Sequence, residues 1–227
     1  MGTRIQSLAN NFTTTGIVKA AAINDTTVSG ITSLPSGIGG ALTLIKSVTA
    51  SSSASIEFIN GTNGVVLDGT YSSYVFSFTD IHPSNNSATL EFNLSTDSGS
   101  NYNVTKTSTY FRAYNYEDDG GAELVYITGR DLAQSTAYQH ILNEISNQDK
   151  SSGCGYMYLY NPSSTTFVKH FTSTTNIRYS NSGFTSFFSS NNYIAGYGNT
   201  TSAINAVQFK FDSGNIDDGI IKLYGVS

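Results

Sequence analysis

The sequence is poor in charged residues, contains one cysteine and has no tryptophan. Only 12% of its 227 residues are Asp, Glu, Lys or Arg, against about a quarter in an average soluble domain. The single cysteine, Cys154, excludes an intrachain disulfide and therefore a disulfide-stabilised secreted scaffold; we expect it to be a small buried thiol. The net charge is −5 without any basic cluster, so nucleic acid is not an expected partner, because binding phosphates requires grouped Lys and Arg.

Long apolar runs are also missing. The first residues, Met1 to Gln6, open no stretch of signal-peptide length, and no segment approaches the ~20 apolar residues that span a bilayer. We therefore expect a protein that is made in a cytoplasm without export and that does not insert into a membrane.

Motifs of catalysis and cofactor binding are missing as well. The chain has no Gly-x-Ser-x-Gly elbow, phosphate loop or dinucleotide fingerprint. Its three histidines, His82, His140 and His170, have no Cys, His or acidic neighbour at metal-ligand spacing. We expect no cofactor and no metal.

Paired carboxylates are the remaining enzymatic option, since glycan hydrolysis needs two of them across the scissile bond. The candidates are Glu117-Asp118-Asp119 with Glu123, and Asp217-Asp218. Adjacent carboxylates on a loop are usually solvated, and they bind a hard cation only with further oxygen ligands. We therefore expect a protein that is not an enzyme.

Ser, Thr, Asn and Gly fill the place of the missing charges, and short segments with apolar residues at every second position recur between turn residues. This pattern predicts an all-β fold, an antiparallel β-sandwich of jelly-roll type. Its first strands are expected to follow one another as a meander. No internal repeat of fixed period is evident, which argues against a propeller or solenoid. The strands are expected near 42–48, 56–58, 74–79, 90–94, 107–116, 124–127, 155–160, 166–171, 193–197, 207–211 and 221–224.

The stretch from Leu132 to Ile145 fits two structures. Ala133, Ala137 and Ile141 recur every four residues, as on one face of a helix. Alternation around Tyr138 suits a strand instead. We expect a strand, because strands are predicted on both sides.

The end of the chain shows the clearest alternation. Two apolar series are separated by a polar loop, 213–219, that contains two glycines. We predict a hairpin that closes the sandwich core, and its core residues are Phe209, Phe211, Ile221 and Leu223.

Tyrosine is abundant, with 15 residues. Alternation in 155–160 places Tyr156, Tyr158 and Tyr160 on one face of a strand. Flat rings with hydroxyl groups can bind a sugar or a protein, and a row of them can equally pack between subunits or support neighbouring strands. Both interpretations are kept.

Residues 1–40 differ from the predicted sandwich, 41–227. They carry apolar residues in a setting rich in Gly and Ser, which indicates an extended or short-helical arm that docks on another protein; the alternative is a partly disordered tail. The candidate attachment residues are Ile5, Leu8, Phe12, Ile17 and Val18.

Three stretches of the sandwich resemble a module of virion proteins from marine tailed bacteriophages. They are Ser55-Ile56-Glu57-Phe58-Ile59-Asn60-Gly61 through Tyr74 to Pro83, Asn161-Pro162-Ser163-Ser164 through Phe171, and Phe209-Lys210-Phe211 through Val226. The resemblance implies a β-sandwich module of fibres, spikes or decorations, exposed on the virion surface and commonly homotrimeric. It implies no catalytic residues.

From this resemblance we expect a structural bacteriophage protein, a tail fibre or tail-associated protein for host recognition. The alternative is a head fibre or capsid decoration protein. A glycan-degrading tail spike is disfavoured by the short chain and the missing long β-helical repeats. The expected partners are copies of the chain, other virion proteins bound through the arm, and a glycan or protein of the host surface.

Overall fold

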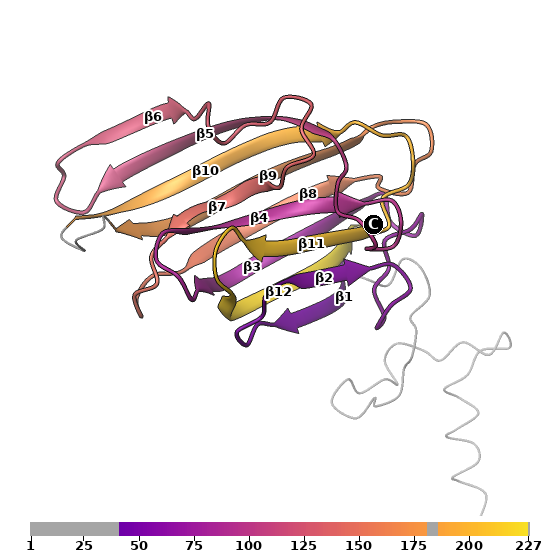
Figure 1. Ribbon diagram of the computed structural model, residues 1–227, viewed down its shortest axis with the longest axis horizontal. Helices are drawn as coiled ribbons and strands as arrows, with labels where there is room; N and C mark the ends of the chain where they lie inside the picture. The colour runs from indigo at the N-terminus through magenta and orange to yellow at the C-terminus, as the bar shows by residue number, and fades with distance from the viewer. Residues whose placement is uncertain (1–40, 181–185, 227) are drawn as a thin grey trace, which may run out of the picture. The chain divides into compact units, whose positions relative to one another are not determined.

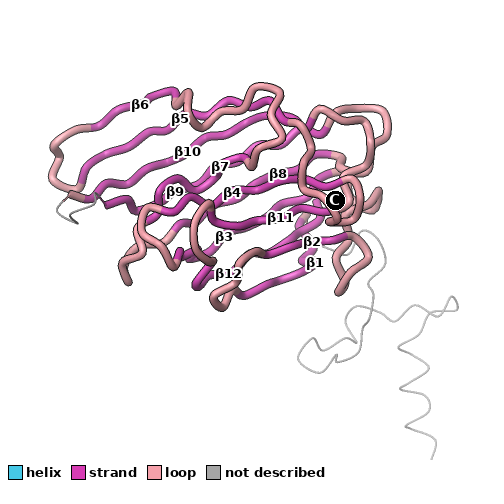
Figure 2. The backbone as a smooth tube through the Cα atoms, in the orientation of Figure 1, coloured by secondary structure: helices cyan, strands magenta, loops and turns pink. Residues whose placement is uncertain are grey.

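The computed structural model describes residues 41–180 and 186–226. In these ranges the chain forms only strands and loops, packed as two layers of antiparallel sheet (Figures 1 and 2), which confirms the predicted sandwich. The described part contains no helix that could cross a membrane. The predicted arm, with Ile5, Leu8, Phe12, Ile17 and Val18, lies outside the described residues.

The larger sheet has eight strands and the smaller sheet has four. In spatial order the larger sheet consists of β1 (Leu42–Thr49), β12 (Ile216–Val226), β3 (Ser73–Pro83), β8 (Gly153–Tyr160), β9 (Lys169–Ser180), β10 (Phe187–Gly198), β5 (Lys106–Tyr116) and β6 (Ala122–Tyr126). The smaller sheet consists of β2 (Ile56–Ile59), β11 (Ala206–Phe211), β4 (Ala88–Ser95) and β7 (Gln139–Ile145).

The strand order is that of a jelly roll with additions. Eight strands, β2 to β7 with β10 and β11, are divided between the sheets in the spatial orders 2-11-4-7 and 3-10-5-6 that two Greek keys produce. The hairpin β8–β9 is inserted between β3 and β10, and β1 and β12 extend the larger sheet beyond β3. These additions widen the larger sheet, which therefore has twice as many strands as the smaller sheet that packs against it.

The core between the sheets is built around phenylalanine rings. Phe209 of the smaller sheet is fully buried, and its ring centroid lies 5.1 Å from that of Phe76 and 5.3 Å from that of Phe78, both in edge-on geometry. Such pairs stabilise a core beyond their buried area. Ile221 and Leu223 are fully buried and Phe211 is 3% exposed, so each contributes about 1.5–3 kcal/mol by burial.

The two terminal strands do not form the predicted hairpin. β11 pairs with β2 and β4 in the smaller sheet, whereas β12 pairs with β1 and β3 in the larger one. The loop 212–215 crosses between the sheets beside the connection from β3 to β4, and Ser84 and Asn215 bond to each other there. The predicted meander is wrong for the same reason, since β2, β3 and β4 alternate between sheets. Alternation shows that one face of a strand is buried but not which sheet it joins.

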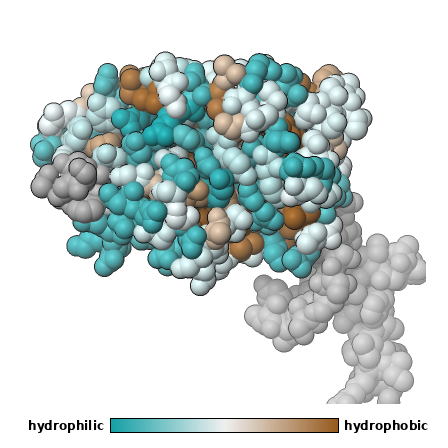
Figure 3. Space-filling model, viewed as in Figure 1, coloured by the Kyte–Doolittle hydropathy of each residue, from teal (hydrophilic) through white to brown (hydrophobic). Residues whose placement is uncertain are grey.

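Other boundaries also differ from the prediction: β9 covers Lys169–Ser180 where 166–171 was expected, and β10 covers Phe187–Gly198 where 193–197 was expected. β12 begins at Ile216, so that Asp217, Asp218 and Gly219 belong to a strand with shifted register rather than to a loop. The ambiguous stretch is a strand only over 139–145, and residues 132–138 form its preceding loop. The side of the molecule seen in Figure 3 is mostly hydrophilic, and its apolar side chains are scattered.

Candidate functional site

Strand β8 presents a row of tyrosines on the outside of the larger sheet. Met157 and Leu159 are fully buried, and Tyr156 and Tyr160, which alternate with them, are 45% and 37% exposed. The rings of Tyr158 and Tyr160 are stacked with centroids 5.9 Å apart, and Tyr156 meets Tyr158 edge-on at 5.7 Å. The three predicted tyrosines thus form one continuous aromatic row.

The register of the larger sheet extends this row sideways. Tyr156 lies opposite Thr174 on β9, which lies opposite Tyr193 on β10. Tyr193 in turn lies opposite Phe111 on β5, and these two rings are stacked with centroids 5.1 Å apart. The last member is Tyr126 on β6, opposite Phe111. Directly opposed side chains on one face are close enough to act together, so aromatic rings of β10, β5 and β6 adjoin one another, and Thr174 of β9 lies between them and Tyr156 of β8.

We call this surface the aromatic face: the outward-facing side chains of β8, β9, β10, β5 and β6. Its rings are Tyr156, Tyr158, Tyr160, His170, Tyr193, Tyr197, Phe111 and Tyr126, and Leu124 adds a 68% exposed aliphatic side chain. Several exposed aromatic and aliphatic side chains on one side of a sheet are typical of a surface that binds a partner.

A shallow hollow of about 320 Å³ lies within the aromatic face. Its floor consists of small residues, among them Ala195 and Thr172, and His170 and Tyr197 stand beside it with ring centroids 6.0 Å apart. The size is at the lower end of pockets that hold small ligands, about 300–1,000 Å³. The surface is therefore not flat, because small side chains leave a hollow between the aromatic rings.

The aromatic face carries almost no charge. Among the outward-facing positions of its five strands in the described ranges, the one Lys, Arg, Asp or Glu is Arg178. The Nε atom of Arg178 lies 3.0 Å from Glu117 Oε1, and its guanidinium lies over the Phe187 ring, 3.9 Å from the centroid. Hence the face offers no net charge to a partner.

Hydroxyl and amide groups supply its polarity instead. Tyr160 and Thr172 share a hydrogen bond between their hydroxyl oxygens, 3.0 Å apart, and Asn176 Nδ2 donates to Asn191 Oδ1 at 2.8 Å. At the β6 edge, the hydroxyl of Tyr126 donates to Asp131 at 2.6 Å, and this bond raises the pKa of Tyr126. Such groups can both donate and accept hydrogen bonds while remaining neutral.

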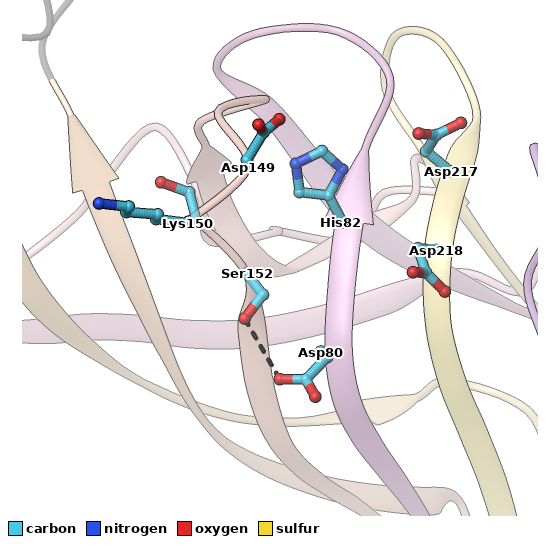
Figure 4. A pocket seen from close by; sticks show the side chains of 8 residues that line it. Asp80, His82, Asp149, Lys150, Ser152, Asp217 and Asp218 are labelled. Carbon is cyan, nitrogen blue, oxygen red and sulfur yellow. Dashed lines mark hydrogen bonds between the residues drawn. The ribbon is translucent and has the colours of Figure 1, made fainter.

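A second hollow, of about 420 Å³, lies where β3, β12 and the loop before β8 meet (Figure 4). Four aspartates line it, Asp80, Asp149, Asp217 and Asp218. Two of them accept hydrogen bonds from adjacent protein groups: Asp217 Oδ1 from Ser52 Oγ at 2.7 Å, and Asp218 Oδ1 from the amide of Gly219 at 2.7 Å.

The two acidic groups considered in the sequence lie on different elements: Glu117 to Glu123 belong to the β5–β6 hairpin, and Asp217 and Asp218 belong to β12. Glu117 pairs with Arg178, and Glu123 accepts from the hydroxyl of Tyr114 at 3.0 Å. Within the described ranges no three His, Cys, Asp or Glu side chains stand close enough together to hold a metal ion.

The expectation of a buried Cys154 is wrong. Cys154 has the same outward orientation on β8 as the tyrosines, and it is exposed. Its Sγ accepts a hydrogen bond from the backbone N–H of Asp80 at 3.4 Å. The alternation of β8 decided its orientation, whereas the expectation rested only on the general tendency of cysteine to be buried.

The structure brings Tyr156, Tyr158 and Tyr160 together, but it adds residues that sequence reasoning missed. Phe111, Tyr126, Tyr193 and Tyr197 come from three other strands. Their outward orientation could be inferred from alternation, but their adjacency depends on the strand order, which alternation does not contain.

Comparison of the chain with protein-family models, with curated proteins and with solved structures finds no match.

Proposed function

We propose that the protein is a structural, non-enzymatic bacteriophage protein, a tail fibre or tail-associated protein, and that its aromatic face binds a neutral glycan of the host surface. The proposal combines the resemblance of the three stretches in 55–226 to phage virion modules with the surface chemistry of the larger sheet. The jelly roll is an architecture that viral capsid and lectin domains use, which supports the class of protein without identifying its ligand.

The aromatic face carries this proposal. A pyranose ring has apolar C–H faces and an equatorial rim of hydroxyl groups, so it needs flat apolar surfaces bordered by neutral donors and acceptors. The rings of Tyr156, Tyr193 and Phe111 provide the flat surfaces, and the Thr172 hydroxyl and the Asn176 amide provide donors and acceptors beside them. An anionic ligand would instead require unpaired basic side chains, and the basic residue found on this surface in the described part of the chain, Arg178, is paired with Glu117.

A direct test measures binding of the full chain to a panel of immobilised neutral oligosaccharides. The double variant Tyr156→Ala/Tyr160→Ala should weaken binding by about tenfold or more, because two exposed rings are removed. Tyr138→Ala is the matched control, since Tyr138 stacks against Lys210 and bonds to Gln208 of the smaller sheet. Equal binding by wild type and double variant would refute the role of the aromatic face.

The same face could instead be buried between copies in a trimer, as the sequence also allows. Sedimentation of wild type and double variant distinguishes the two roles. A glycan-binding surface leaves the oligomeric state unchanged, whereas a subunit interface loses its assembly when the two rings are removed.

The position on the virion tests the class of protein. A labelled antibody against the chain should mark the tail, and the purified chain should compete with phage adsorption to host cells. Heavy labelling around the whole shell would favour the alternative of a head fibre or capsid decoration protein. Release of reducing sugar from host polysaccharide would overturn the non-enzymatic assignment.

A further inference from the structure

Lys106, the first residue of β5, has its side-chain amine enclosed in the protein. The residue is fully buried, and Nζ donates to Asn93 Oδ1 at 2.5 Å and to the carbonyl oxygen of Val104 at 2.9 Å. None of the ion pairs in the described ranges includes this lysine. Burial lowers the pKa of Lys106 to about 7, so a large fraction of the amine is neutral and nucleophilic near neutral pH.

The amide of Asn93 on β4 is held from four directions. The residue is fully buried, and besides Lys106 its Oδ1 accepts from the backbone N–H of Leu94 at 2.9 Å. Its Nδ2 donates to the carbonyl oxygens of Tyr102 at 2.7 Å and Thr136 at 3.0 Å. These bonds fix the plane of the amide, and the backbone N–H of Leu94 would stabilise the negative charge that develops on Oδ1 while Nζ attacks the carbonyl carbon.

From this geometry we propose that Lys106 and Asn93 form an intramolecular isopeptide bond. Lys106 Nζ attacks Asn93 Cγ, a new Nζ–Cγ bond forms, and negative charge passes through Oδ1. The Cγ–Nδ2 bond then breaks, and Nδ2 takes up the proton that Nζ loses and departs as ammonia. A neutral amine and a primary amide become a secondary amide and ammonia, so the step requires no oxidant, reductant or co-reactant.

The bond would join the two sheets at one end of the sandwich. Asn93 lies on β4 of the smaller sheet and Lys106 on β5 of the larger sheet, 13 residues further along the chain. Gly198 on β10 lies opposite Lys106, and a Cβ there would stand 3.1 Å from Val104 and 3.3 Å from Leu94. The glycine therefore allows the chain segments around the lysine and asparagine to pack closely.

Lys169 serves as an internal control, because it is a buried lysine whose amine bonds to the backbone rather than to a side-chain amide. It is also fully buried and lies opposite Gly198 from the other side, on β9. Its Nζ donates to two backbone carbonyl oxygens, those of Phe167 at 2.6 Å and Thr200 at 3.3 Å. A backbone peptide is a much poorer target than a side-chain amide that can expel ammonia, so Lys169 should stay unmodified.

The intact mass of the denatured wild-type chain tests the proposal. The expected mass is lower than that of the sequence by one ammonia molecule. Asn60-Gly61 and Asn63-Gly64 could lose ammonia by succinimide formation, so the loss has to be located. Cleavage after Glu91 and Tyr102 separates Asn93 from Lys106 unless a bond joins them.

The expected product is one branched peptide that contains both residues, together with trypsin resistance after Lys106 and ordinary cleavage after Lys169. Linear peptides with unmodified Asn93 and Lys106 would overturn the proposal, and because this result comes from the wild-type chain it does not depend on any variant folding. Lys106→Met should abolish the branched peptide and Lys169→Met should retain it. Asn93→Asp should form the same bond with loss of water, and a folded Asn93→Asp chain at its full sequence mass would count against the mechanism.

Discussion

The two faces of the larger sheet use the same strands for different purposes. On β8, Met157 and Leu159 point into a core of edge-on phenylalanine rings, whereas Tyr156, Tyr158 and Tyr160 point out and form a stacked row. Both faces are rich in rings, and within the described ranges a second sheet covers the inner face but not the outer one. The difference indicates that outer-face side chains can be substituted without loss of the fold, whereas inner-face side chains maintain it.

The largest expected effect comes from placing a charge on the inner face. Leu223 is fully buried on β12 between Phe76 of β3 and Lys46 of β1 in register. Leu223→Asp would bury an unpaired carboxylate at a cost of about 4–5 kcal/mol or more, which is comparable to the stability of many domains. We expect no soluble folded chain, as judged by gel filtration and circular dichroism.

Lys222→Asp is the matched control for that variant. Lys222 is the preceding residue, faces the opposite side of the same strand and is partly exposed. A folded Lys222→Asp chain beside an unfolded Leu223→Asp chain confirms the difference between faces. If both variants fold with equal stability, Leu223 does not support the core.

Alanine substitutions at two neighbouring residues of β8, one on each face, compare the two faces with smaller effects. Met157→Ala removes a fully buried side chain and should lower the free energy of unfolding by about 2–5 kcal/mol. Tyr156→Ala removes a ring that is 45% exposed and should cost at most about 1 kcal/mol. Urea denaturation measures both values. A larger loss for Tyr156 than for Met157 would show that the aromatic face supports the fold rather than serving a ligand.

A pH dependence should come from the smaller sheet, whose outer face is charged where the aromatic face is not. His140 on β7 lies 3.0 Å from Arg130 Nη1 and 3.6 Å from Glu91 Oε2. Burial, and then the positive charge of Arg130, lowers the pKa of His140 to about 4, below the unfolded value of about 6.5. Between these values the unfolded chain binds the additional proton, so stability should fall as pH decreases from about 6.5 to about 4.

The variant His140→Gln isolates this contribution. Burial raises the pKa of Glu91, and a raised carboxyl pKa acts with the opposite sign as pH falls. The informative quantity is therefore the difference in urea midpoint between wild type and variant at about pH 7 and about pH 4.5. If that difference does not change with pH, His140 is not held neutral in the folded chain.

The sequence predicted the fold class and the orientation of individual side chains because alternation with period two records which face of a strand is buried. It assigned Met157 and Tyr156 to opposite faces correctly. It failed where two different partners satisfy the same pattern: Phe209 and Leu223 are both core residues, but they lie in different sheets. Sheet membership depends on long-range pairing, which leaves no local signal in the chain.

The buried pair of Lys106 and Asn93 left no signal for a related reason. Lys106 follows Asn103-Val104-Thr105 in a polar stretch that has the composition of an exposed segment. Its burial comes from β4, from β10 and from the loop around Ser135, which are separated from it in sequence, and from the loop that directly precedes β5. Charged residues are almost never fully buried, so composition alone does not indicate that this lysine is enclosed.

The smallest expected effect concerns the start of β12, where Asp217 and Asp218 follow the buried Ile216. Asp217 and Asp218 are exposed, and their carboxylates accept from Ser52 Oγ and from the amide of Gly219. Asp217→Ala and Asp218→Ala should change the free energy of unfolding by at most about 0.5 kcal/mol and leave oligosaccharide binding unchanged. Urea midpoints and the same glycan panel measure the two quantities. Lost binding with an intact fold would transfer the binding site from the aromatic face to the acidic hollow that these aspartates share with Asp80 and Asp149.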